Sequence, residues 1–287
     1  TMKSDRRNCD LSFSNLCSWR FLYDTQYAVI DNFLVFKFWA GEQLAYMMPV
    51  GSGDLKAILR ELIEDADKEK HNFCMLGVCS NMRADLEAIL PGQFTFTENR
   101  DYADYIYLRS DLATLKGKKF QAKRNHINRF RNTYPDYEYT PITPDRIQEC
   151  LDLEAEWCKV NNCDQQEGTG NERRALIYAL HNFEALGLTG GILHVNGKIV
   201  AFTFGMPINH ETFGVHVEKA DTNIDGAYAM INNEFANHIP EQYIYINREE
   251  DLGLEGLRKA KLSYQPVTIL EKYMACLKDH PMDIIRW

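Results

Sequence analysis

The same order of strands and helices occurs twice along the chain, and this repeat restricts the possible folds more than any single motif. In the first half, residues 28–51 are typical of a strand pair that turns near Gly41. Residues 51–70 predict a helix capped by Asp54, with an apolar stripe at spacings of three and four. The remaining elements are a strand, a short helix and a strand, expected over 72–79, 81–90 and 103–108.

The second half repeats this order after two entry helices, expected over 145–161 and 171–187. Asn196 and Gly197 predict the turn of a hairpin over 190–208, because this pair favours the backbone of a tight two-residue turn. The elements that follow are expected as a strand, a helix, a strand, a helix and a last strand, over 211–221, 223–239, 243–247, 254–263 and 267–274. The halves match in order rather than in residues.

Composition favours a globular chain of two domains. The chain has 287 residues, of which 45% are apolar and 25% charged, so it can bury a substantial core. No apolar run approaches the roughly 20 residues that a membrane-spanning helix needs. The N-terminal residues lack the continuous apolar core of a secretory signal, and we therefore expect a cytoplasmic protein without a transmembrane segment.

The eight cysteines show no CxxC spacing. Cys74 and Cys79 lie in an apolar run, where a thiol behaves as a small hydrophobic group. We therefore expect reduced, packed thiols, with neither a metal site nor a disulfide framework.

The order of elements resembles the GNAT acyltransferase fold, used twice. This resemblance implies an α+β fold with mixed sheets, built from two tandem GNAT-like units. The first unit would cover 1–115, a basic linker helix 116–135, and the second unit, expected to be the active half, 136–287. In that fold the donor's carbonyl lies where two central strands separate, and the pyrophosphate of acyl-CoA rests on a helix N-terminus.

The usual glycine-rich acyl-CoA loop is missing from both halves. The first half offers Gly51 and Gly53, followed by Asp54, whose charge would oppose a phosphate. At the matching place in the second half the resemblance implies donor-binding residues, which are Asp225, Gly226 and Ala227. The favoured interpretation of both segments is an ordinary strand-to-helix turn capped by an Asp, so an acyl-CoA donor is possible but not favoured.

Two stretches, residues 111–135 and 245–267, resemble the C-terminal catalytic domain of phosphatidylglycerol lysyltransferases. That family is a branch of the fold, related to Fem-like transferases, that takes its acyl group from aminoacyl-tRNA. The resemblance implies an aminoacyl-tRNA or acyl-CoA donor and a small-molecule, peptide or lipid-headgroup acceptor, with no cofactor and no metal. The membrane-embedded portion of the lysyltransferases has no counterpart in this sequence.

The stretch over 116–131 carries seven cations and no acid, although the net charge of the chain is −9. It predicts a helix from about Lys118 with a narrow apolar face. We interpret Lys119, Lys123 and Arg124 as donor-binding residues, because uncompensated cations would repel one another unless a polyanion such as tRNA neutralised them. The alternative is a solvated linker helix.

The candidate catalytic residues lie in the second half. His216 and Glu218 alternate on the strand period, which places them on one face beside the donor, where either could be the base. Tyr264 is the candidate general acid. By resemblance the donor-contacting residues of this region are Asn247, Arg248, Lys259 and Lys261. The alternatives are a satisfied polar pair on an exposed sheet face and a surface helix with Glu and Lys partners.

Three functions are consistent with these patterns. The first is transfer of an aminoacyl group from aminoacyl-tRNA to an amine or hydroxyl acceptor. The second is an acyl-CoA-dependent N-acetyltransferase. The third is a non-catalytic module that binds tRNA or another anion through the basic helix.

Overall fold

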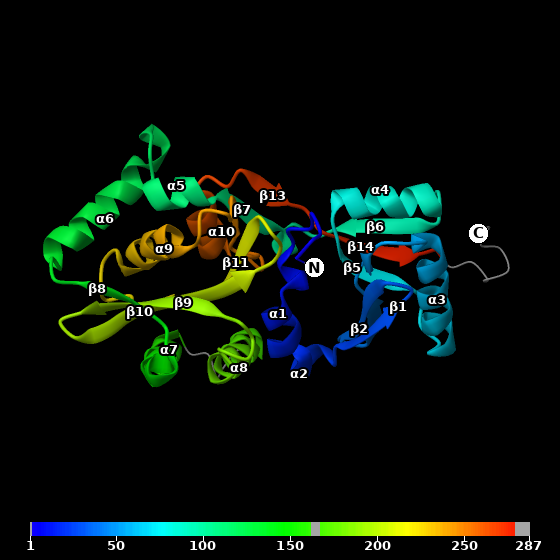
Figure 1. Cartoon of the computed structure of the whole chain (residues 1–287), viewed down its shortest axis with the longest axis horizontal. Coiled ribbons are helices and arrows are strands. Elements are labelled where there is room, and N and C mark those ends of the chain that lie inside the picture. Colours follow the sequence, from blue (N-terminus) through cyan, green and yellow to red (C-terminus); the bar gives the residue numbers. More distant parts are fainter. Residues whose placement is uncertain (1, 162–166, 279–287) are drawn as a thin grey trace.

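Two mixed sheets at opposite ends of the long axis form the framework of the molecule (Figure 1). The computed structural model describes residues 2–161 and 167–278. Each sheet has seven strands within these residues, with parallel and antiparallel pairs in both. The predicted α+β architecture with mixed sheets is thereby confirmed.

The first sheet has the order β1-β2-β3-β5-β14-β6, and β4 also pairs with β2. Its strands are β1 Gln26–Ile30, β2 Phe33–Ala40, β3 Gln43–Tyr46, β4 Val50–Gly51, β5 Cys74–Val78, β6 Phe94–Glu98 and β14 Tyr273–Leu277. Helices α3 (Leu55–Lys68) and α4 (Ser80–Ile89) pack on it through one apolar cluster. The predicted cap of α3 is confirmed, because Asp54 accepts a hydrogen bond from the backbone N–H of Ala57.

The second sheet has the order β13-β7-β12-β11-β10-β9-β8. Its strands are β7 Asp104–Leu108, β8 Glu138–Pro141, β9 Thr189–Val195, β10 Lys198–Pro207, β11 Thr212–Ala220, β12 Tyr245–Asn247 and β13 Thr268–Leu270. The predicted hairpin is confirmed, since β9 and β10 pair around Asn196 and Gly197. Both turn residues have positive φ, as this tight turn requires.

Helices cover both faces of the second sheet (Figure 1). Helices α6 (Gln121–Thr133) and α9 (Ala227–His238) pack on one face, where α5 (Arg109–Thr114) also lies. Helices α7 (Ile147–Asn161) and α8 (Glu167–His181) cover the other face. Helix α10 (Glu255–Leu262) follows β12.

The N-terminal segment lies between the two sheets, as Figure 1 shows for α1 (Phe13–Ser18) and α2 (Arg20–Tyr23). The sequence analysis predicted neither helix. It also missed β6, because the alternation over residues 94–98 is short and mostly exposed.

The two sheets exchange strands between the halves of the sequence. Strand β7 precedes the linker but pairs with β12 and β13 of the second sheet. Strand β14 ends the described chain but lies between β5 and β6 of the first sheet. The strand predicted over 267–274 is therefore divided, with β13 in one sheet and the start of β14 in the other. The proposed boundaries, 1–115, 116–135 and 136–287, stay a prediction. Two strands, β7 and β14, pair with the sheet of the other predicted unit.

The expectation of reduced thiols without a disulfide is wrong for three of the described cysteines, which are Cys74, Cys158 and Cys276. Cys74 on β5 and Cys276 on β14 form a disulfide across a sequence separation of 202 residues. The pairing depends on β14 returning to the first sheet, which no local pattern in the sequence indicates. Cys9, Cys17, Cys79 and Cys150 are free.

Candidate functional site

The central strands of the second sheet separate after a short parallel contact. Strands β11 and β12 pair only from Thr212 with Tyr245 to Gly214 with Asn247. Beyond this point β11 continues to Ala220, whereas the chain after Asn247 leaves the sheet. The side chains that follow each strand therefore face one another across the opening.

A β-bulge at His216 changes the predicted direction of its side chain. Along β10, the neighbours Phe204 and Gly205 pair with Val217 and Val215, so His216 is an extra residue in β11. His216 contacts the N-terminal segment on one side of the sheet, whereas Glu218 contacts α9 on the other. The prediction that both lie on one face is wrong, because simple alternation fails at a bulge.

Glu218 and Arg248 bridge the opening between the strands. Arg248 Nη2 donates to Glu218 Oε1 at 3.0 Å, and Asn232 Nδ2 from α9 donates to Glu218 Oε2 at 3.2 Å. Arg248 Nη1 and Asn232 Oδ1 are buried, and neither has a hydrogen-bond partner within the described part of the chain. A buried polar atom without a partner is costly, so this pair of free atoms is suited to a ligand.

Two cations lie close to the ring of Tyr264 beside this pair. Lys123 Nζ lies 3.9 Å and Arg248 Cζ 4.8 Å from the ring centroid. Burial and, to a lesser extent, the positive charge of Arg248 lower the pKa of Lys123 to about 8, although Glu218 opposes the change. Burial raises the pKa of Tyr264 well above its usual range, so its hydroxyl stays protonated at neutral pH.

Lys261 holds the backbone that carries Arg248. Its ammonium group donates to the carbonyl oxygens of Arg248 and Glu250, and its side chain is buried. Lys259, two residues earlier on α10, is exposed. Of the predicted residues, the structure thus gathers a subset around Tyr264: Lys123, Glu218, Arg248, Lys261 and Tyr264 itself.

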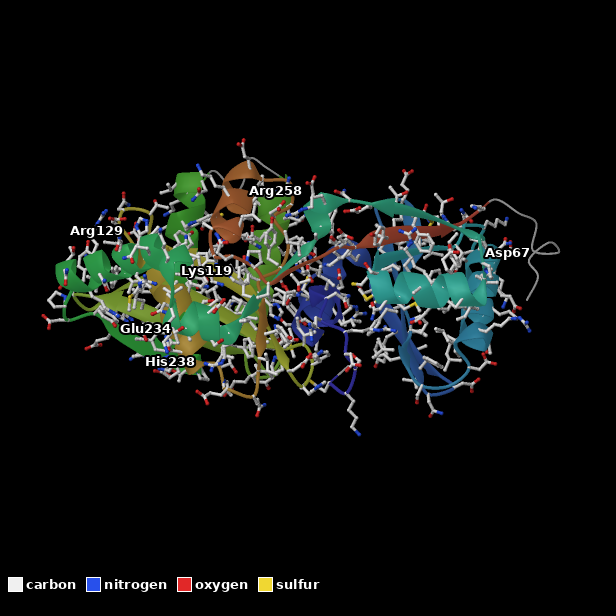
Figure 2. The ribbon with its side chains drawn as sticks, turned by 90° about the horizontal axis from the view of Figure 1, so that it is seen from above. Asp67, Lys119, Arg129, Glu234, His238 and Arg258 are labelled. Carbon is white, nitrogen blue, oxygen red and sulfur yellow. A yellow bond between two sulfur atoms is a disulfide. The ribbon has the colours of Figure 1, made fainter. Side chains whose placement is uncertain are left out.

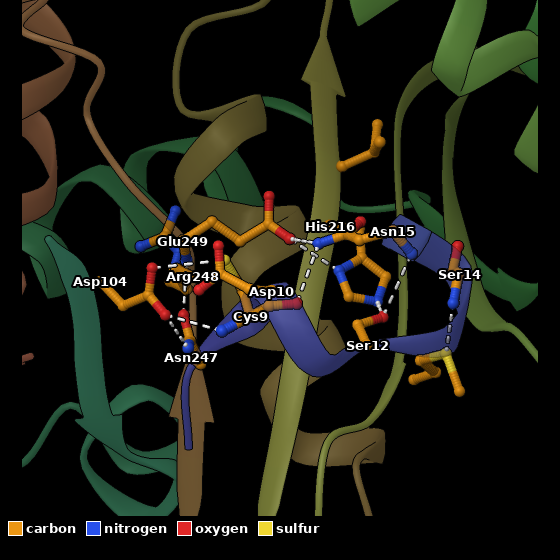
Figure 3. A network of polar contacts seen from close by, with 12 residues as sticks. Cys9, Asp10, Ser12, Ser14, Asn15, Asp104, His216, Asn247, Arg248 and Glu249 are labelled. Atoms are coloured by element: carbon orange, nitrogen blue, oxygen red, sulfur yellow. Dashed lines mark hydrogen bonds and ion pairs between the residues drawn. The ribbon is translucent and has the colours of Figure 1, made fainter. Parts of the chain in front are cut away.

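His216 belongs to a separate network with the N-terminal segment (Figure 3). Its Nε2 lies 2.8 Å from Ser12 Oγ and its Nδ1 2.8 Å from Glu249 Oε1. Asn15 also donates to Glu249 at 2.7 Å. This order of Ser, His and carboxylate resembles a catalytic triad, but Ser12 is only 1% exposed and also caps α1. The network therefore attaches the N-terminal segment to the second sheet.

Asn247 points toward Asp104 in a buried charged junction (Figure 3). Its amide donates to Asp104 Oδ2 at 2.8 Å and to the carbonyl oxygen of Arg7 at 2.7 Å. Lys272 Nζ lies within 2.9 Å of Asp10, Asp104 and Glu250. This junction joins the N-terminal segment to β7 and to the chain segment that leads from β13 to β14.

The junction carries more carboxylates than cations. Burial raises the pKa of Glu250 to about 7, although Lys272 opposes this shift. Burial alone would lower the pKa of Lys272, yet Asp10 and Asp104 raise it well above its ordinary value. Cys9, Asp104 and Glu250 have the spacing of metal ligands, but the Lys272 ammonium already lies among them as the counter-ion.

Three cations of the basic stretch form ion pairs with acids from other parts of the chain. Lys119 pairs with Asp111, Arg129 with Asp225 and Arg131 with Glu234. Figure 2 shows Lys119 and Arg129 along this segment, and Glu234 on the same side of the molecule. The inference that the cations of this stretch stay uncompensated without an external anion is therefore wrong for these three, because α5, α9 and the turn before α9 supply carboxylates.

The predicted helix itself is confirmed. A short turn of 3-10 helix, Lys118–Phe120, leads into α6, and Phe120, Ile127 and Phe130 are buried. Arg124 donates to the carbonyl oxygens of Leu115 and Gly117, so it caps the preceding turn. Lys116 and Lys118 are exposed.

Helix α6 also packs against the start of α9. Gly226 has a φ of +83°, and a Cβ at this position would lie 3.1 Å from the carbonyl oxygen of His126. Ala227 is buried beside it, and Asp225 is held by Arg129. The helix end expected to hold the pyrophosphate of acyl-CoA is thus partly covered by α6.

In the first half, Arg6 of the N-terminal segment reaches the loop after β3, beside a pocket of about 350 Å³ that it lines together with Gly51 and Gly53. Strands β3 and β5 pair only at Tyr46 and Met75. Arg6 donates to the carbonyl oxygens of Met48 and Pro49 at 2.8 and 2.7 Å. Gly51 is required by packing, because a Cβ would lie 2.2 Å from the carbonyl oxygen of Asn32.

Sequence reasoning missed Asn232, Asp104 and Lys272. Asn232 and Asn233 are polar residues on the buried side of α9. A polar pair within an apolar helix face was the one signal in the sequence that could have indicated Asn232. Asp104 and Lys272 meet only through the exchanged strands.

Comparisons with known proteins agree with this architecture. A crystal structure from Bacteroides thetaiotaomicron, described as a conserved protein of unknown function, is 95% identical, with a TM-score of 0.95, over 97% of this chain and 94% of that one. A curated relative, an uncharacterised protein of Mycoplasmoides gallisepticum, is 26% identical over 175 residues. The match covers 60% of this chain and only 55% of the relative's length.

Two further structures share the fold at low identity. The C-terminal domain of a putative lysylphosphatidylglycerol synthetase from Agrobacterium fabrum is 14% identical, with a TM-score of 0.71, over 97% of this chain and 89% of that one. L-PGS from Bacillus licheniformis is 18% identical, with a TM-score of 0.65, over 98% and 96%. Within residues 2–161 and 167–278 no helix has the length and apolar character to cross a bilayer.

A family model described as "phosphatidylglycerol lysyltransferase, C-terminal" matches residues 1–276. The predicted resemblance is confirmed, and the chain belongs to this family of acyltransferase-fold domains.

Proposed function

We propose that the protein transfers an aminoacyl group from aminoacyl-tRNA to an amine or hydroxyl acceptor at the opening between β11 and β12. The observation that carries this proposal is the cluster of Glu218, Arg248, Asn232, Tyr264 and Lys123. It combines buried hydrogen-bond donors, a free acceptor and a protonated tyrosine at the position where the resemblance to acyltransferases implies the donor carbonyl.

In this proposal Arg248 Nη1 donates to the ester carbonyl oxygen as negative charge develops on it. Glu218 is a positioning residue that holds Arg248 and Asn232. Tyr264 donates its proton to the leaving ribose oxygen and receives the proton that the acceptor loses. A bond forms from the acceptor to the carbonyl carbon, and the bond from that carbon to the ribose oxygen breaks.

His216 is not part of the proposed chemistry, since the bulge directs it to Ser12 and Glu249. An acyl-CoA donor is the competing choice. One feature counts against it: α6 packs on Gly226 at the start of α9. Lys116 and Lys118, exposed beside Lys119, are the proposed contacts for the tRNA backbone.

The test is binding of the purified full chain to aminoacylated tRNA, deacylated tRNA and acetyl-CoA over a salt series. We expect aminoacylated tRNA to bind most tightly. The triple variant with Lys116, Lys118 and Lys119 changed to Ala should bind it more weakly, with a log–log salt slope lower by about 2 to 3. A matched control removes three exposed cations elsewhere: Lys68, Lys70 and Lys198.

The control variant should bind like the unchanged protein. Binding of acetyl-CoA without binding of tRNA would contradict the proposal and favour an ordinary acyltransferase.

A further inference from the structure

The charges around Tyr264 bear on which aminoacyl group the site accepts, if it acts on aminoacyl-tRNA as proposed above. Lys123 and Arg248 lie over this ring, and Glu218 is the carboxylate that pairs with Arg248. Lys261 uses its donors on two backbone carbonyl oxygens. The cluster therefore has an excess of positive charge.

Glu218 is already committed to protein partners. Its Oε1 accepts from Arg248 and its Oε2 from Asn232, and Arg248 neutralises its charge. An incoming ammonium group would have to compete with a buried guanidinium at 3.0 Å for this carboxylate. Bringing a second cation next to Arg248 and Lys123 is unfavourable in a site with little water.

The free atoms of the cluster fit a different substituent. Arg248 Nη1 is a buried donor without a partner in the described ranges, and in the same residues no carboxylate pairs with Lys123 Nζ. Both can donate to an oxyanion. Asn232 Oδ1, a buried acceptor, can receive a hydrogen bond from the α-amino group that every aminoacyl ester carries.

We propose that the site takes an aminoacyl group whose side chain is anionic or uncharged, with a carboxylate favoured, and rejects a lysyl group. This inference rests on the proposed function and names the class of its substrate. The depressed pKa of Lys123 agrees with it, because burial and the positive charge of Arg248 are its two main causes.

The experiment uses one tRNA body acylated in turn with glutamate, alanine and lysine through a stable 3′-amide, so that only the aminoacyl group differs. The measurement is the dissociation constant of each for the full chain. We expect the glutamyl form to bind at least about tenfold more tightly than the lysyl form, with the alanyl form between them.

Lys123→Gln keeps a half-buried polar side chain and should reduce this preference to about threefold or less by removing one cation. Lys198→Gln, a change of the same kind on the exposed β9–β10 turn, should retain the full preference. Circular dichroism of each variant checks that the fold is intact.

The two proposals fail in different ways. Equal or tighter binding of the lysyl form would overturn the charge preference and leave the aminoacyl-tRNA function standing. If none of the three acylated forms bound more tightly than deacylated tRNA, both the proposed function and this inference would be overturned.

Discussion

Glu250 allows the buried junction to be tested through the pH dependence of stability. Its pKa is raised from an ordinary 4.5 to about 7, with burial as the main cause. A carboxyl group with a raised pKa in the folded state binds its proton more tightly there than in the unfolded chain. Its contribution to stability is therefore present below pH 4.5 and is lost as the pH rises through about 7.

Glu250→Gln replaces the carboxyl group with a neutral group of the same shape and removes this dependence. The difference between the two pKa values corresponds to about 3 kcal/mol, of which about 2 to 3 kcal/mol falls between pH 5 and 8. The unfolding free energy of the variant minus that of the unchanged protein should therefore rise by about 2 to 3 kcal/mol from pH 5 to pH 8. Asp10 does not disturb the comparison, because Lys272 lowers its pKa against the effect of burial.

Urea unfolding at pH 5, 6, 7 and 8 measures this difference directly. Histidines that titrate in the same range act on both proteins and cancel in the comparison. Glu255→Gln, the same change at an exposed position on α10, is the control and should give a flat difference. If the difference in unfolding free energy between Glu250→Gln and the unchanged protein also stayed constant with pH, the raised pKa of Glu250 would be refuted.

Three further predictions concern separate features. Cys276→Ser should lower the unfolding free energy by about 2 to 4 kcal/mol in urea, because the disulfide closes a long loop; no change would show that the thiols are reduced in solution. Gly226→Ala should cost about 1 to 3 kcal/mol, and more than Gly92→Ala, since both have positive φ but only Gly226 contacts α6; equal costs in thermal unfolding would contradict that packing. Lys123, with a pKa of about 8, should react with an amine-directed label at pH 8 before the exposed Lys198, and peptide mass spectrometry would show the reverse order if its pKa were ordinary.

Local patterns predicted the elements whose signals are contained in a few residues. Asp54 at the start of α3 and the Asn196-Gly197 turn are such signals, and both were confirmed. The apolar stripe of α6 was also visible, because a helix that packs on one side repeats its buried residues at spacings of three and four.

What the sequence did not reveal depends on contacts between distant segments. Strand β14 joins β5 across about two hundred residues, and the disulfide between Cys74 and Cys276 follows from that pairing. The bulge at His216 inserts one residue into an otherwise regular alternation, so counting by two placed this side chain on the wrong face. The acids that pair with the basic stretch come from α5, from α9 and from the turn just before α9.

The candidate site shows the same division. Glu218, Arg248 and Tyr264 could be proposed from the sequence because they lie on or next to elements whose order the local patterns predicted. Asn232 was missed, since a polar residue on a buried helix face is visible only once the helix has a partner. The choice among the predicted cations required the structure, which separates Lys123 from Arg124 although they are adjacent.

The central claim is that aminoacyl transfer takes place on the α9 side of the opening between β11 and β12. The most direct measurement is transfer of a radiolabelled amino acid from tRNA to a mixture of amine and hydroxyl acceptors, by the unchanged protein and by Tyr264→Phe, with tRNA binding measured in parallel. The account predicts transfer by the unchanged protein and a loss of about a hundredfold in the variant, with binding retained. Undiminished transfer by Tyr264→Phe, or transfer by the unchanged protein from acetyl-CoA alone, would contradict it.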